Sequence, residues 1–354
     1  MNKNKKVTVA MSGGIDSAVA ALLLKNEGYD TVGATMLLCQ KILPDGTDAT
    51  ETDIRDARSI CDKLGIDHKV YDLSDEFKNT VIKDFTDTYM NGATPNPCIV
   101  CNKLLKFGKL LDLELALGAD MIATGHYARI EQDKNGRFLL KKAADTKKDQ
   151  TYMLWSLSQH QLSHTLFPLG NLQKTEIREI GAENGFVNAH KSDSQDICFI
   201  PDGDYASFIE KDLGIQFPQG DYVDEDGNIL GKHKGMIHYT IGQRKGLGIS
   251  MNKHIFVIKK DAATNTVTLA DENKLFTDKV IIKNINLIPF DSFEGDIKVE
   301  AKIRYSQSQS PAIARITGED EITLTFSTPQ RAPARGQSAV MYIGDTVIGG
   351  GIII

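Results

Sequence analysis

The sequence predicts an α/β domain built on a parallel sheet, followed by a mainly β second half. Strand-like apolar runs at 7–10, 31–36 and 66–71 alternate with segments of helical periodicity as far as residue 117. Regular alternation of this kind is typical of a parallel sheet with helices on both faces. After about Leu213 the helical periodicity fades, and short alternating strands separated by Gly, Asp and Asn replace it.

The elements of the first half follow from residue types and turn signals. β-branched residues in Val7-Thr8-Val9 indicate a buried strand, and the Ala/Leu run that follows indicates a helix. Two prolines in the segment 94–97 favour an extended lead into another helix. In chain order we expect strands over 7–10, 31–36, 66–71 and 120–124, and helices over 18–24, 54–64, 75–90, 98–117 and 170–185.

Length and composition indicate a globular protein of two or three domains. A chain of 354 residues exceeds what one hydrophobic core usually holds, and its 41% hydrophobic and 25% charged residues are ordinary values. We expect an α/β domain over 1–205, a small central domain over 206–275 and a C-terminal β-barrel over 276–354. No membrane-spanning run or signal peptide is evident, and five cysteines without a regular framework suggest a cytoplasmic protein.

The loop Ser12-Gly13-Gly14-Ile15-Asp16-Ser17 lies between the first strand and the first helix. It places N–H groups and hydroxyls at a helix N-terminus, which favours an anion because the first N–H groups have no internal partner. A Walker loop would carry Gly-Lys-Ser/Thr, but the charged residue here is Asp16, which repels phosphate unless a divalent cation intervenes. We predict a pyrophosphate site with Mg²⁺ beside Asp16; the alternative is an ordinary turn capped by serine.

The cysteines are candidates for chemistry, metal binding or packing. Cys98 and Cys101 form a Cys-x-x-Cys pair at the start of a predicted helix, where the helix dipole should lower the pKa of a thiol below about 8.5. A zinc site is the alternative, but structural zinc needs four ligands and no second pair exists. Cys198 has apolar neighbours and by itself is typical of a core cysteine, as are Cys39 and Cys61.

The net charge of −6 does not indicate nucleic-acid binding by itself. Phosphate contacts need only local Lys and Arg, and a protein that is acidic overall can be basic on one face. Basic stretches at 103–109, 141–148 and 232–245 therefore permit an RNA partner without requiring one.

The glycine loop resembles the SGGxDS loop of the N-type ATP pyrophosphatases, which split ATP between its α and β phosphates and adenylate a substrate. Further motifs, in the same order nearly end to end, resemble one family in this superfamily, the tRNA-specific 2-thiouridylases. They are 94–97 (TPNP), 101–102 (CN), 123–127 (ATGHY), 148–150 (KDQ), 194–200 (SQDICFI), 239–248 (YTIGQRKGLG), 335–340 (RGQSAV) and 349–351 (GGG). The resemblance implies a Rossmann-like, adenine nucleotide alpha hydrolase-like catalytic domain.

The resemblance also implies a reaction, namely thiolation at C2 of the wobble uridine (U34) in the tRNAs for Glu, Gln and Lys. ATP would adenylate the uridine O2 with release of pyrophosphate, and a cysteine persulfide would deliver sulfur, leaving 2-thiouridine and AMP. Cys198 matches the persulfide carrier, and Cys101 matches the nucleophile that can form a disulfide with it. The partners would be tRNA and a sulfur donor, either a cysteine desulfurase or a relay protein.

Binding residues are carried over by position from the family motifs. The ATP-binding set is Ala10, Met11, Ser12, Gly13, Gly14, Ile15, Asp16, Ser17, Met36 and Gly125. The set that meets the target base or the rest of the tRNA is Asn96, Pro97, Cys98, His126, Lys148, Asp149, Gln150, Arg304, Tyr305 and Gln337. Many members of the family have aspartate where this chain has Cys98, so any acid–base role of that aspartate does not transfer.

Two rival functions remain at this stage. One is another adenylating enzyme with the same loop, such as a 4-thiouridine synthetase or an iron–sulfur tRNA thiolase, the latter needing three or more cysteines close in space. Only Cys98 and Cys101 are paired in the sequence. The other is an RNA-binding or zinc-structured module without catalysis, which tRNA-dependent release of pyrophosphate from ATP would exclude.

Overall fold

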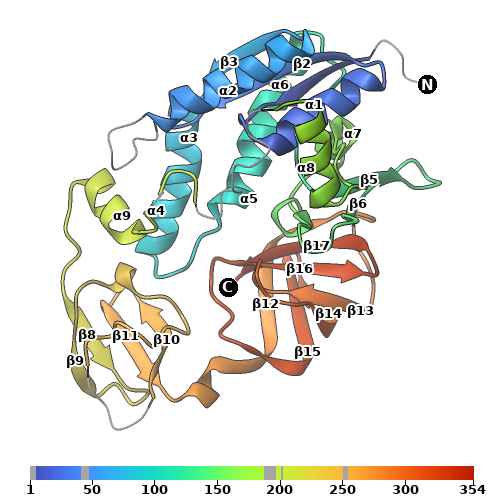
Figure 1. Ribbon diagram of the computed structural model, residues 1–354. Coiled ribbons are helices and arrows are strands. Elements are labelled where there is room, and N and C mark those ends of the chain that lie inside the picture. Colours follow the sequence, from blue (N-terminus) through green and yellow to red (C-terminus); the bar gives the residue numbers. More distant parts are fainter. Residues whose placement is uncertain (1–4, 41–47, 187–196, 201, 250–253) are drawn as a thin grey trace.

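The structure is a computed structural model that describes residues 5–40, 48–186, 197–200, 202–249 and 254–354. It consists of an α/β domain, a small β domain and a C-terminal barrel (Figure 1). In the view of Figure 1 the α/β domain lies at the top, the central domain at the lower left and the barrel at the lower right. The expected parallel sheet, small β domain and C-terminal barrel are thus confirmed.

The α/β domain is built on a five-stranded sheet in the order β3-β2-β1-β4-β7, and every pairing in it is parallel. The strands are β1 (Lys6–Ala10), β2 (Asp30–Leu37), β3 (His68–Asp72), β4 (Met121–Ala123) and β7 (Thr165–Leu166). From β1 the chain adds β2 and β3 on one side and later β4 on the other. The strand order therefore reverses between β1 and β4, where open α/β sheets bind ligands beyond the carboxyl ends of their strands.

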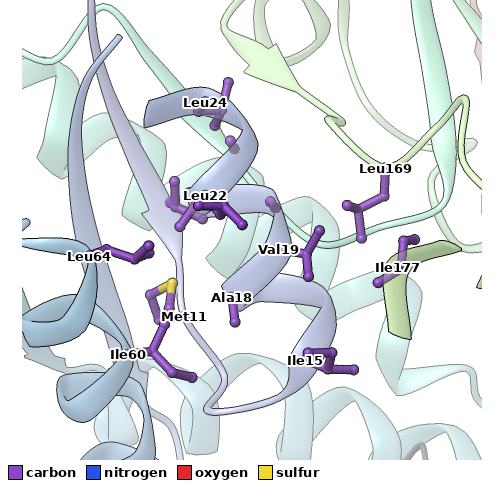
Figure 2. Packing of buried hydrophobic residues seen from close by; sticks show 14 of the residues in the cluster. Met11, Ile15, Ala18, Val19, Leu22, Leu24, Ile60, Leu64, Leu169 and Ile177 are labelled. Carbon is purple, nitrogen blue, oxygen red and sulfur yellow. The ribbon is translucent and has the colours of Figure 1, made fainter. Parts of the chain in front are cut away.

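The helices of this domain pack apolar faces against the sheet. Helix α1 is buried on most of its surface, with Val19 facing Ile177, and Leu22 and Leu64 belong to the same buried cluster (Figure 2). The helices are α1 (Ile15–Asn26), α2 (Ala49–Leu64), α3 (Ser74–Phe77), α4 (Lys83–Met90), α5 (Pro97–Cys101), α6 (Leu110–Ala116), α7 (Gln159–Ser163) and α8 (Lys174–Glu183). Two π segments, η1 (Lys78–Ile82) and η2 (Asn102–Lys109), join α3 to α4 and α5 to α6.

Several local predictions were wrong in extent. Helix α2 begins five residues before the expected start, because Asp48 caps it by accepting a hydrogen bond from the Thr50 N–H at 2.8 Å. The polar loop at 147–150 leads into the 3₁₀ turn η3 (Thr151–Met153). A hairpin of β5 (Ala128–Gln132) and β6 (Phe138–Lys142) was not expected at all.

The central domain begins with α9 (Tyr205–Leu213), capped by Asp204, and continues as a four-stranded sheet in the order β10-β11-β8-β9. Its elements are β8 (Gly220–Val223), β9 (Ile229–His233), η4 (Met236–His238), β10 (Phe256–Asp261) and β11 (Thr266–Ala270). The short turn η5 (Glu272–Leu275) leads from it to the C-terminal domain.

The C-terminal domain is a closed six-stranded antiparallel barrel. Its order is β12-β15-β14-β13-β16-β17, and pairing of β12 with β17 closes it. The strands are β12 (Phe276–Leu287), β13 (Asp296–Lys302), β14 (Ser310–Gly318), β15 (Glu321–Arg331), β16 (Ser338–Ile343) and β17 (Thr346–Ile353). Closure leaves these six strands without an unpaired edge. In addition, β17 pairs with β6 of the β5–β6 hairpin at Thr346 and Lys141.

The barrel and the α/β domain share a core. Phe107 of η2 and Trp155 belong to the same buried cluster as Val340 and Tyr342 of β16. The indole N–H of Trp155 donates to the Ser338 Oγ at 3.1 Å. The barrel is therefore held in place beside the α/β domain. In the described ranges, no helix combines the length and the apolar character needed to cross a bilayer.

Candidate active site

A cavity of about 530 Å³ opens at the carboxyl ends of β1 and β4. It is lined from the glycine loop, the end of β2, the start of α2, the α5–η2 helix, the segment after β4, residues 197–199 and the barrel. The predicted site residues that line it are Ala10, Met11, Ser12, Asp16, Ser17, Met36, Pro97, Cys98, Cys101, Gly125, His126, Gln150, Cys198 and Tyr305. Residues 194–196 of the SQDICFI motif lie outside the described residues.

The glycine loop is shaped by close backbone packing. Gly13 has φ +73°, and a Cβ there would lie 2.6 Å from the carbonyl oxygen of Asp53. A Cβ on Gly125 would lie 2.8 Å from the Ser17 nitrogen, so this glycine lets β4 approach the loop itself. Gly14 is the N-cap of α1, and no side chain caps this helix. Within the turn, the Ser12 Oγ accepts from the Gly14 N–H at 3.4 Å and the Ser17 hydroxyl donates to the Gly14 carbonyl oxygen at 3.0 Å. An anion site at the start of α1 is compatible with this structure.

Asp16 is paired with a lysine that the sequence argument missed. The Lys174 Nζ lies 2.7 Å from Asp16 Oδ1 and 2.8 Å from Oδ2, and the Tyr127 hydroxyl donates to Oδ1 at 2.7 Å. Lys174 is the first residue of α8 and is 6% exposed. The argument that Asp16 needs a divalent cation because the loop has no lysine was therefore incomplete, since Lys174 supplies positive charge from 158 residues away. In the sequence near Lys174, the capping-box pattern of Gln173 and Glu176 indicates the start of a helix, but it does not indicate a contact with Asp16.

Four cysteines line the cavity: Cys39, Cys98, Cys101 and Cys198. None of the four forms a disulfide; Cys98 and Cys198 are exposed, Cys39 is half-buried and Cys101 is buried. Cys39 packs, partly buried, against a hydrophobic cluster as expected but also lines the cavity, whereas Cys61 is fully buried.

The expected lowering of thiol pKa at the start of α5 is wrong. Burial raises the pKa of the Cys101 thiol to about 12. Loss of hydration also raises the pKa of the Cys98 thiol. The largest cause for both thiols is loss of hydration, which disfavours the charged thiolate. Reactivity of Cys101 therefore requires a further source of positive charge.

The cavity does not arrange its ligands as a metal site. Four cysteines line this cavity, whereas the Cys-x-x-Cys spacing in the sequence indicated only two that lie together. Among the described residues, however, no group of three or more His, Cys, Asp or Glu side chains has an arrangement that could hold a metal ion.

The residues expected to meet tRNA fall into two groups. His126 and Gln150 line the cavity; His126 packs against Phe107 and Phe167, and burial holds its pKa well below the ordinary value, so the ring is neutral. Asp149 instead accepts hydrogen bonds from the Ala143 N–H and the Thr151 hydroxyl. Asp149 thus holds a loop of the protein.

A second cavity of about 260 Å³ lies where the three domains meet. Its lining includes Arg304 and Gln337, and Tyr305 lines both cavities. Gln337 donates to the carbonyl oxygens of Thr94 and Pro95, at 3.1 and 2.8 Å. The barrel thereby positions the segment that leads into Pro97 and the cysteine helix.

Comparison with known proteins agrees with this domain arrangement. Profiles described as tRNA methyl transferase HUP domain, tRNA methyl transferase PRC-barrel domain and Aminomethyltransferase beta-barrel domain match residues 5–202, 206–271 and 277–353. The tRNA-specific 2-thiouridylase MnmA of Clostridioides difficile (strain 630) is 49% identical over 100% of this chain and 99% of its own length. The chain belongs to the tRNA-specific 2-thiouridylase family.

A second relative is similar to a comparable degree, whereas a solved structure is only distantly similar. The tRNA-specific 2-thiouridylase MnmA of Clostridium acetobutylicum is 47% identical over 99% of each chain. The solved structure of the U34-tRNA thiolase NcsA from Methanococcus maripaludis, with its 4Fe–4S cluster, has a TM-score of 0.36 and 20% identity over 60% of this chain and 68% of that chain.

Proposed function

We propose that the enzyme thiolates C2 of the wobble uridine in the tRNAs for Glu, Gln and Lys, using ATP. The observation that carries the proposal is that the glycine loop, Cys101 and Cys198 line one cavity. An adenylating loop and two thiols in one space can activate a carbonyl oxygen and then replace it with sulfur. Family membership supports the same reaction.

Adenylation comes first because the C2 carbonyl of uracil is amide-like and a poor electrophile. Attack of O2 on the α phosphorus of ATP releases pyrophosphate and turns O2 into part of a leaving group. The start of α1 would hold the phosphates, and Met36 and Gly125 would lie beside the nucleotide. Mg²⁺ would enter with ATP as part of the substrate, and Asp16 and Asp53 are the carboxylates of the described lining that would hold it.

Sulfur transfer then uses both cysteines. A donor, either a cysteine desulfurase or a relay protein, loads Cys198 with a persulfide. The Cys101 thiolate attacks the inner sulfur, a Cys101–Cys198 disulfide forms, and hydrosulfide leaves and displaces AMP from C2. Alternatively, the outer sulfur of the persulfide attacks C2 directly and displaces AMP, and the Cys101 thiolate then attacks the Cys198 sulfur to release 2-thiouridine and form the disulfide. Both routes give the same products. A thiol reductant must reopen the disulfide, and the two Cα atoms must come within about 7 Å to form it.

Recognition of tRNA is assigned to both domains around the cavity. Asn96, Pro97 and Cys98 would meet the target base, because the first helical turn of α5 faces the cavity. His126, Lys148, Gln150, Arg304 and Tyr305 would contact the rest of the tRNA, whereas Asp149 and Gln337 would support loops that do so. A neutral His126 suits base contacts more than phosphate contacts.

The proposal is tested with purified protein, tRNA, ATP and a persulfide donor, measuring pyrophosphate and 2-thiouridine separately. The Cys101→Ser and Cys198→Ser variants should release pyrophosphate but form no 2-thiouridine. Cys98→Asp is the matched control and should keep product formation, because aspartate is frequent at this position in the family. A Cys101→Ser enzyme with normal product formation, together with a dominant Cys98–Cys198 disulfide on peptide mapping, would reverse the assignment.

An RNA-binding protein without catalysis would release no pyrophosphate in any of these samples, even when tRNA is bound. That outcome would refute the proposed function as a whole. Iron–sulfur absorption in the purified protein would favour the rival thiolase chemistry instead.

A further inference from the structure

The cavity contains one lysine and no arginine in the part of its lining that the structure describes, and that lysine is Lys106. The other charged residues of this lining are Asp16 and Asp53. The species that the proposed reaction brings here, namely phosphates, a thiolate and hydrosulfide, are all anions. Lys174 lies against Asp16 on the glycine-loop side, so Lys106 is the ammonium group of the described lining that is left to face anions beside the cysteines.

The π segment η2 explains why Lys106 lies beside the cysteines. Cys101 ends α5 and Lys106 follows five residues later inside η2. In an α-helix, a residue five positions on is rotated by about 140° from the first. A π turn is wider and is closed by i→i+5 hydrogen bonds, so that residue returns toward the same face. Accordingly, Cys98, Cys101 and Lys106 all line the cavity.

Cys101 needs such a partner. The nucleophile in sulfur exchange is the thiolate, but burial raises the pKa of this thiol to about 12. Cys198, Cys98 and Cys39 face it and disfavour its ionisation further. The charge of Lys106 acts in the opposite direction on both Cys101 and Cys98. His126, also in this space, is neutral and supplies no positive charge.

We propose that Lys106 is the cation that stabilises the Cys101 thiolate and the hydrosulfide that replaces it. This role rests on the proposed function. The Cys101 thiol loses its proton to water in the open cavity, and the thiolate then forms a bond to the inner sulfur of the Cys198 persulfide. The sulfur–sulfur bond of the persulfide breaks and its electron pair leaves on hydrosulfide. Lys106 stays protonated throughout and remains near the negative charge on both sides of the step.

The test measures thiol reactivity without tRNA or a sulfur donor. Iodoacetamide alkylation is followed across a pH series, and peptide mapping reports Cys98, Cys101 and Cys198 separately. In Lys106→Met, Cys101 alkylation at a fixed pH below its pKa should fall about tenfold, which corresponds to a rise of about one pH unit in its pKa. Lys106→Arg should restore most of the rate. Lys103→Met, which removes an exposed lysine of the same π segment, is the control and should change nothing.

A second measurement separates this role from ATP binding. Lys106→Met should retain tRNA-dependent pyrophosphate release while 2-thiouridine formation falls. Loss of pyrophosphate release with unchanged Cys101 alkylation would assign Lys106 to ATP and overturn the proposal. If Lys106→Met does not fold, Lys106→Gln replaces it, and unchanged alkylation there overturns the proposal equally. Because alkylation needs no RNA, a protein that never thiolates tRNA would refute only the proposed function.

Discussion

Lys260 of β10 is buried between the central domain and the α/β domain, and its removal should stabilise the protein. The residue is 6% exposed, and its Nζ finds no hydrogen-bond partner within the described part of the chain. Its nearest compensation is the ring of Tyr89 in α4, whose centroid lies 5.6 Å from the Nζ. The Tyr89 ring also stacks on the ring of Tyr205 in α9, with the two ring centroids 4.7 Å apart.

The magnitude follows from the pKa of Lys260, which burial lowers from 10.5 to about 8. At about 1.4 kcal/mol for each pH unit, this difference corresponds to about 3 kcal/mol of destabilisation at neutral pH. The folded state binds the proton less tightly than the unfolded state. Stability therefore declines as the pH falls from 10.5 to 8, and the full cost is present below pH 8.

Lys260→Met keeps the length of the side chain and its packing on Tyr89 but removes the charge. Allowing for the lost cation–π attraction of about 1 kcal/mol, we expect the free energy of unfolding at pH 7 to rise by about 2 kcal/mol. The gain should shrink as the pH rises toward 10.5 and disappear above it, where lysine is neutral in both states. Urea unfolding of both proteins at several pH values measures this difference.

Lys259→Met is the matched control, because the Lys259 side chain is 67% exposed and lies 3.9 Å from a carboxylate oxygen of Asp261. It should change the free energy of unfolding by less than about 0.5 kcal/mol at every pH. A Lys260→Met protein that is destabilised equally at neutral and alkaline pH would refute the reasoning. Such a result would mean that the ammonium group is hydrated or paired in solution.

Three further predictions concern the active site and the barrel. Asp16→Ala should fold and bind tRNA yet release no pyrophosphate, and normal release would exclude a role of Asp16 beside the phosphates. Lys174→Met should lower pyrophosphate release at least tenfold and leave Cys101 alkylation unchanged, because Lys174 contacts Asp16 at 2.7 Å; equal release by the variant would make this pair purely structural. Arg304→Gln should weaken tRNA binding and reduce its salt dependence by about one phosphate contact, so unchanged affinity at low and high salt would contradict its assignment.

Much of the fold could be predicted because it depends on local patterns. The β-branched run before Ser12 and the apolar helix after it place a glycine loop at a strand–helix junction, whatever follows in the chain. The helices at 75–90 and 98–117 were predicted within a few residues, since their apolar periodicity is long. The β5–β6 hairpin was missed. It joins the sheet of the barrel through β17, which lies far along the sequence, so local patterns do not indicate where it packs.

The sequence by itself determined the type of nucleotide loop, the candidate thiols and the order of the domains. Only the tertiary structure decided which charges meet them. Lys174 contacts Asp16 although 158 residues separate them in the sequence. The π turn after Cys101 places Lys106 in the cavity that the cysteines line. The direction of the thiol pKa shift also depends on packing, because the loss of water around Cys101 is its largest cause and is a property of the whole cavity.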